Sequence, residues 1–173
     1  MQNIGLRARK LLLTLHILFA SIMFGVTVVF LILSIAAAAS SDRDILMAAY
    51  TSMHLLAKTS VRASTIGTVI TGVLLSVVTH WGFFRYHWLI LKEGLTVLSI
   101  GLGMVGIYVW SLNGLTIVES QGIGALENPE FLVNRTYLFI GIGLQLVSLI
   151  AIFLLSVLKP WGKRKKRQDK VTQ

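Results

Sequence analysis

The sequence predicts an all-α integral membrane protein, a four-helix bundle with both termini in the cytoplasm. Of its 173 residues, 55% are hydrophobic and 13% are charged, whereas soluble chains carry about 25% charged residues. The mean hydropathy of +0.78 and several long apolar runs indicate that the bilayer is the solvent. Because the chain has no cysteine, disulfides, thiolate metal sites and cysteine nucleophiles are excluded.

Four apolar segments are each long enough to cross a bilayer, which needs about 20 residues. We expect the spans at about residues 11–39, 44–79, 88–112 and 136–158. The first has no Asp, Glu, Lys or Arg and is far longer than the apolar region of a cleaved signal peptide, about 7 to 15 residues. Lys159-Pro160 should end the fourth span, since the proline ring cannot continue helical hydrogen bonding.

The segments between the spans predict one compact membrane domain. A short polar turn at 40–43, an aromatic turn at 80–87 and a longer loop at 113–135 join the helices, and none has the composition of an interdomain linker. We therefore assign residues 1–162 to a single transmembrane domain and residues 163–173 to a basic cytoplasmic tail.

Basic residues predict the orientation, because cytoplasmic segments are enriched in Lys and Arg. The side that holds the termini carries Arg7, Arg9, Lys10, Arg85, Lys159, Lys163, Arg164, Lys165, Lys166, Arg167 and Lys170. The other side carries Arg43, Arg135 and, counted generously, Lys58 and Arg62. The basic tail directly follows a span, so its expected partners are anionic lipid headgroups and not nucleic acid.

His16 and Lys92 are ionisable residues inside apolar segments. Counted from the expected span ends, His16 lies about 7 Å and Lys92 about 6 Å inside the membrane. Such residues cost about 2.5–3.5 kcal/mol on insertion scales and therefore suggest function. Because imidazole is the commonest metal ligand, His16 is a candidate ligand to a group held between helices. The structural alternative is that His16 bonds a neighbouring helix and Lys92 extends to the interface.

His54, Lys58 and Arg62 recur every four residues and predict one cationic stripe on the outer half of the second helix. Such a stripe needs anions, and Arg62 can form a fork onto a carboxylate. The anions could come from a tetrapyrrole or quinone-like ligand, from a lipid phosphate, or from acidic residues of the chain. The acidic candidates are Asp42, Asp44, Glu119, Glu127 and Glu130. His54 and His16 lie too far apart along the bundle to share one metal.

Two further patterns argue against other functions. Residues 101–106, GLGMVG, match the dinucleotide-binding glycine pattern, but they lie in an apolar helix and not after a strand. The chain also has no Ser-His-Asp set, no paired catalytic carboxylates and no H-E-x-x-H motif, so hydrolytic chemistry has no support.

Several separated residues resemble a small bacterial integral-membrane superfamily. They are Leu15-His16 with Gly25, Arg62-x-Ser64, Thr71-Gly72, and Leu91-Lys92 with Leu95. The superfamily contains the CopD-type copper-resistance domain, the HemJ-type protoporphyrinogen oxidase and the domain of unknown function 2269, and the chain looks most similar to the last. The resemblance covers about residues 11–113.

The resemblance implies a four-helix bundle in the bacterial cytoplasmic membrane, with His16 as candidate haem ligand and Lys92 as its functional partner. Two departures argue against protoporphyrinogen oxidation itself. Met23-Phe24 stand where a tryptophan is usual in the first helix, and Trp88 replaces an arginine one turn before the lysine.

The leading functional hypothesis is that the bundle binds a b-type haem or related tetrapyrrole. His16 would be the axial ligand and Lys92 or Arg62 would meet a propionate, and the protein could act as a haem-dependent membrane oxidoreductase. The sequence identifies no second axial histidine. The sequence does not decide whether the protein forms a homodimer or belongs to a larger membrane complex.

Two alternatives belong to other functional classes. A CopD-like protein would pass copper inward, from Met47, Met53 and His54 at the outer face towards Met23 and His16. The other alternative is an accessory membrane protein without a ligand.

Overall fold

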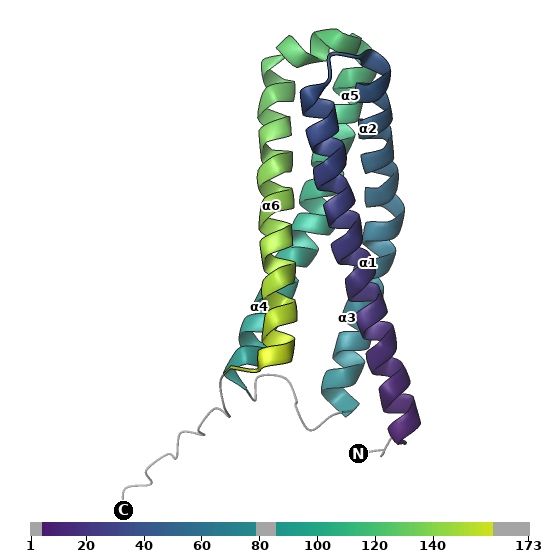
Figure 1. The fold of residues 1–173 in the computed structure, drawn as a ribbon, viewed down its shortest axis with the longest axis vertical. Helices are drawn as coiled ribbons and strands as arrows, with labels where there is room; N and C mark the ends of the chain where they lie inside the picture. Colours follow the sequence, from purple (N-terminus) through teal and green to yellow (C-terminus); the bar gives the residue numbers. More distant parts are fainter. Residues whose placement is uncertain (1–4, 79–85, 161–173) are drawn as a thin grey trace, which may run out of the picture.

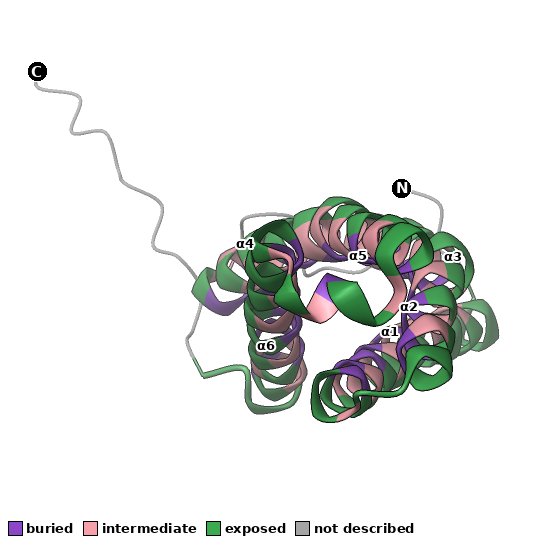
Figure 2. Ribbon diagram, turned by 90° about the horizontal axis from the view of Figure 1, so that it is seen from above, coloured by how far each residue is buried: buried purple, intermediate pink, exposed green. Residues whose placement is uncertain are grey.

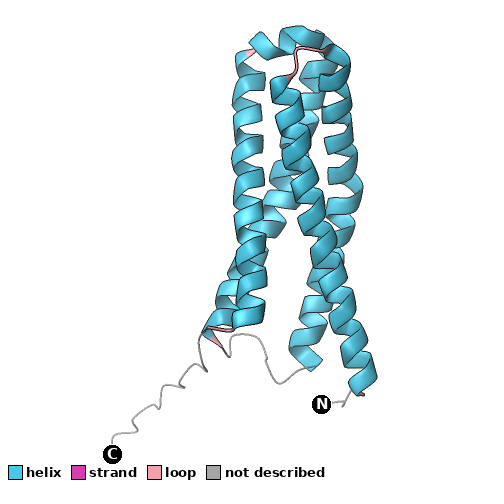
Figure 3. Ribbon diagram, viewed as in Figure 1, coloured by secondary structure: helices cyan, strands magenta, loops and turns pink. Residues whose placement is uncertain are grey.

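The computed structural model describes residues 5–78 and 86–160, which are almost entirely helical (Figure 3). The helices are α1 (Leu6–Ala39), α2 (Arg43–Leu56), the π-helix η1 (Ala57–Val61), α3 (Arg62–Val78), α4 (His87–Ile100), the π-helix η2 (Gly101–Ile107), α5 (Tyr108–Gln121), the 3₁₀-helix η3 (Gly122–Glu127) and α6 (Pro129–Leu158). Together they make four rods, because α2, η1 and α3 run on as one helix, and so do α4, η2 and α5, with η3 leading on to α6. The predicted four-helix membrane bundle is confirmed.

The helix ends follow local sequence signals. The side chain of Asp42 accepts a hydrogen bond from the amide of Asp44 (2.8 Å), which caps α2 after the polar turn. Asn128 caps α6 in the same way through the amide of Glu130 (2.8 Å), and Pro129 occupies the first helical position. At its other end α6 stops at Leu158, directly before the predicted Lys159-Pro160 boundary.

The prediction of a long loop at residues 113–135 is wrong. Helix α5 continues to Gln121, η3 follows at once, and α6 already begins at Pro129. Asn128-Pro129 looked like a loop signal, yet here it is the cap and first residue of a helix. Gly122 makes the reversal possible, because its φ of +57° is a conformation that residues with a Cβ rarely adopt.

The four rods are longer than the thickness of a bilayer requires. The candidate spans have 34, 36, 41 and 30 residues, and each contains a window apolar enough to cross a membrane. Since a bilayer core is about 30 Å thick and a helix rises about 1.5 Å per residue, part of the bundle must extend beyond the hydrocarbon.

Packing differs between the two ends of the bundle. The main core lies in the half that contains α2 and α5, where Phe30, Tyr50, Met53 and Phe131 are buried. In the other half α1 packs on α3 and α4 packs on α6, and the two pairs diverge (Figures 1 and 2). A second, small core of Trp88, Leu89 and Leu155 joins only α4 to α6. The divergence leaves room for a cavity at the end where α1 begins and α6 ends.

Candidate functional site

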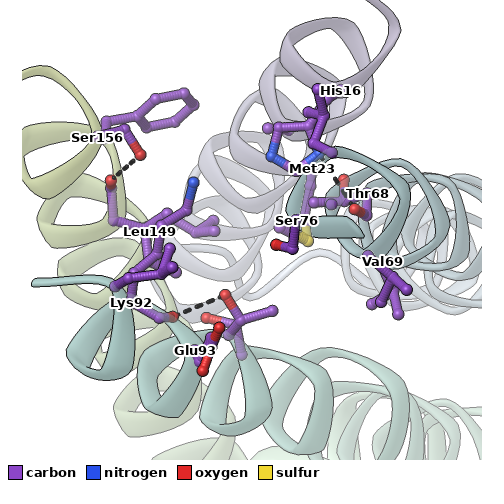
Figure 4. Close-up of a pocket in the computed structure, with 18 of the residues that line it drawn as sticks. His16, Met23, Thr68, Val69, Ser76, Lys92, Glu93, Leu149 and Ser156 are labelled. Atoms are coloured by element: carbon purple, nitrogen blue, oxygen red, sulfur yellow. Dashed lines mark hydrogen bonds between the residues drawn. The ribbon is translucent and has the colours of Figure 1, made fainter. Parts of the chain in front are cut away.

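A cavity of about 670 Å³ lies between the diverging helix pairs. Side chains from α1, α3, α4 and α6 line it, and most of the lining is apolar. Its volume falls in the range of about 300–1,000 Å³ that is typical of ligand and cofactor sites. The structure brings His16 and Lys92 together here, on opposite walls (Figure 4).

The His16 ring is held by α3 through one of its nitrogens. Nδ1 lies 3.1 Å from the carbonyl oxygen of Thr68 and 2.9 Å from Oγ1 of Thr71. A carbonyl oxygen only accepts hydrogen bonds, so Nδ1 is the protonated donor. Thr71 is suited to accept as well, because its hydroxyl proton is donated to the carbonyl of Gly67 (2.6 Å).

This arrangement leaves Nε2 of the neutral ring with a lone pair. Nε2 has no hydrogen-bond partner among the described residues. Histidines that bind metals usually donate their other N–H to a carbonyl or carboxylate, which fixes the ring and its tautomer. His16 therefore has the arrangement of a preorganised ligand at the wall of a cavity.

The cavity also collects positive charge. Arg9, Lys92 and Lys159 all contribute to its lining, from α1, α4 and the end of α6. The charge of Lys92 acts electrostatically on both His16 and Glu93. The lining thus holds three basic side chains against one acidic side chain, Glu93, and this excess of positive charge would attract an anionic group.

Polar atoms without partners mark the walls of the same cavity. Thr68 Oγ1 and Ser99 Oγ are buried with no hydrogen-bond partner in the described part of the chain, on residues that are 8% and 1% exposed. Glu93 Oε1 is a third such atom. Buried polar groups usually find partners, so these atoms are consistent with a ligand or water in the cavity.

The other predicted site residues lie elsewhere in the bundle. Arg62 places its guanidinium carbon 4.3 Å from the centroid of the Tyr108 ring, and the His54 ring centroid lies 5.2 Å from the same ring. Lys58 is exposed on this helix. None of the three stripe residues belongs to the cavity lining. The structure thus separates the His16–Lys92 pair from the stripe.

The methionines proposed for a copper path are engaged in packing. Met53 is fully buried and its sulfur accepts the hydroxyl of Ser34 at 3.3 Å. Met23 is 6% exposed and its sulfur accepts the hydroxyl of Thr65 at 3.5 Å. Within the described ranges, no three His, Asp or Glu side chains gather where a metal ion could be held.

Sequence reasoning did not identify the hydroxyls that surround His16. Thr71 belonged to the family resemblance without an assigned role, and Thr68 was not predicted to be a partner of His16. Their contacts join residues more than 50 positions apart in the chain. The only sequence signal was the number of hydroxyl residues in α3, a segment that is otherwise apolar.

Comparison with known proteins gives no relative from which to infer a function. No family model, curated protein or solved structure matches the chain.

Proposed function

We propose that the protein binds a b-type haem or a related tetrapyrrole in the cavity, with Nε2 of His16 as the axial ligand. The observation that carries this proposal is the pair of hydrogen bonds that fixes His16 Nδ1 and directs the lone pair to Nε2. A haem iron can be held by one proximal histidine. A tetrapyrrole brings its own equatorial nitrogens, so a single imidazole suffices.

The shape and charge of the cavity fit such a ligand. Its apolar walls suit a flat macrocycle, and about 670 Å³ is adequate for a cofactor of this size. Arg9, Lys92 and Lys159 would receive the propionates at the end of the bundle where both described ends of the chain lie. By the distribution of basic residues, this end faces the cytoplasm.

The chemistry of the bound group would be one-electron transfer, and the protein would then serve as an oxidoreductase component of the bacterial cytoplasmic membrane. The chain's own residues would bind and orient the group. Thr68 and Thr71 hold the imidazole, Lys92 neutralises a carboxylate, and the apolar walls exclude water.

The number of available side-chain ligands supports a tetrapyrrole over copper. A copper ion would need several side-chain donors, whereas the sulfurs of Met23 and Met53, two of the three methionines proposed for that path, already accept hydroxyl protons. His54 is also not among the residues that line the cavity.

The deciding experiment is a visible spectrum of the detergent-purified protein, oxidised and then reduced with dithionite, with metal analysis of the same sample. We expect a Soret band and sharp α and β bands after reduction. A colourless sample, even when haem is supplied during expression, would overturn the proposal. Copper in such a sample would instead support the transport alternative.

A further inference from the structure

Two π-helical segments converge on Tyr108. In a regular helix, residues 54 and 62 would point about 80° apart, because eight residues at about 100° each do not complete whole turns. The π-helix η1 lies between them and accommodates one extra residue, which reduces the difference to about 20°. His54 and Arg62 therefore both reach the Tyr108 ring, which directly follows the second π-helix, η2.

The Arg62 side chain has an aromatic partner instead of an acidic one. Its guanidinium carbon lies 4.3 Å from the ring centroid of Tyr108, and no carboxylate of the described ranges forms an ion pair with it. A cation over a ring keeps most of its N–H donors available to an anion. The stripe thus offers positive charge that the described part of the chain does not neutralise.

This group of residues lies at the edge of the bundle, where His54, Arg62 and Tyr108 are half-buried and Tyr108 packs against the main core. Lys58 is exposed, and apolar neighbours one turn away on each helix are exposed as well, with Leu55 at 59%, Ile66 at 49% and Val105 at 63%. Exposed aliphatic residues on a membrane-spanning helix are typical of a surface that meets lipid chains. The ligand that reaches this surface therefore comes from the bilayer.

Helix lengths place the group at a membrane interface. A distance of about 30 Å corresponds to about 20 helical residues. Counting 20 residues from the lower end of α3 at Val78 leads to Lys58, and counting 20 from Trp88 leads to Tyr108. Trp110 and Tyr137 stack at the same level, with ring centroids 6.3 Å apart, as aromatic residues do at headgroup depth.

We propose that Lys58 and Arg62, whose guanidinium the Tyr108 ring holds, bind the phosphate of an anionic phospholipid, in the leaflet opposite the His16 cavity. Arg62 would form a fork onto the phosphate, Lys58 would add a second charge, and His54 would pack against the same ring. This site goes beyond the proposed haem function and shares no residue with the cavity lining.

The test uses the full-length protein in nanodiscs of phosphatidylcholine, with or without phosphatidylglycerol. Native mass spectrometry counts the retained anionic lipids, and thermal melting reports their effect on stability. We expect phosphatidylglycerol to raise the melting temperature of the unchanged protein. Arg62→Gln should retain one anionic lipid fewer, and the affinity of this variant for phosphatidylglycerol should be roughly tenfold lower.

Two controls make the result decisive. Arg43→Gln removes an exposed cation on the same rod, 19 residues away, and should retain the lipid. Lys58→Gln, an exposed substitution, tests the site should Arg62→Gln fail to fold. Equal lipid loss in Arg43→Gln, or none in both site variants, would overturn the proposal. So would an equal stabilisation by inorganic phosphate in discs without phosphatidylglycerol, since a soluble anion would then be the ligand.

Discussion

Nδ1 of His16 lies 3.1 Å from the carbonyl oxygen of Thr68, so a main-chain acceptor on α3 sets the tautomer of a histidine on α1. A main-chain acceptor cannot be removed by substituting one side chain, so substitution of the Thr68 side chain would leave this hydrogen bond in place. The ring nitrogen that remains available, Nε2, is the atom on which the proposed function depends.

The imidazole itself gives the first prediction. His16→Ala should abolish haem retention, because no other histidine of the described ranges lines the cavity, whereas His54→Ala should leave it unchanged. The measurement is haem content per protein after purification. Added imidazole should restore a Soret band in His16→Ala by entering the space that the side chain vacated. Equal haem content in both variants would remove His16 from the site.

A glycine beside the ring allows a subtler test. A Cβ at position 72 would lie 3.2 Å from Cε1 of His16, so Gly72→Ala should displace the ring by a few tenths of an ångström. We expect haem affinity to fall by roughly tenfold, as for other changes that disturb ligand orientation. Gly94→Ala, also near the cavity but with no neighbour within 4 Å of its added Cβ, is the matched control. Titration of each apoprotein with haem measures the haem affinity of the two variants. Equal affinities of Gly72→Ala and Gly94→Ala would contradict the proposed geometry.

The charge of Lys92 predicts selectivity for ligand carboxylates. The unchanged protein should bind metal-free protoporphyrin more tightly than its dimethyl ester, by roughly tenfold, because a hydrogen bond to a charged group contributes about 1.5–3 kcal/mol. Lys92→Gln should lose this preference, while Lys10→Gln, an exposed change outside the cavity lining, should keep it. Fluorescence titration measures both ligands. A preference that survives in Lys92→Gln would assign the carboxylate to another residue.

Close packing in the other half of the bundle predicts a stability effect. Gly114 of α5 is buried against the Tyr50 ring, which occupies the space that a Cβ would need. Gly114→Ala should therefore lower the free energy of unfolding by about 1–3 kcal/mol, since overpacking forces neighbours to move. Gly143→Ala, with open space at its Cβ, should be neutral or slightly stabilising. Thermal melting in detergent compares the two, and a harmless Gly114→Ala would show that this contact is not tight.

The four membrane spans followed from the sequence because apolar transfer is a property of each segment on its own. A run of about 20 apolar residues prefers the bilayer whatever its neighbours are. The capping and proline signals at Asp42 and Lys159-Pro160 are local in the same sense. The prediction of a loop at residues 113–135 was wrong because Asn128-Pro129 fits both a loop and a helix start. Only the packing of η3 distinguishes these two possibilities.

The depth of a residue along its helix could also be predicted from the sequence. The rotation of the helix about its axis could not. Equal depths predicted that His16 and Lys92 could meet, and both line one cavity. Only the tertiary structure decided that Thr68 holds His16, and that Arg62 turns to Tyr108 and away from the cavity. These contacts depend on the relative rotation of two helices and on a π-helical turn that shifts it. Hydropathy is insensitive to both, because it records how apolar a residue is and not which neighbour it faces.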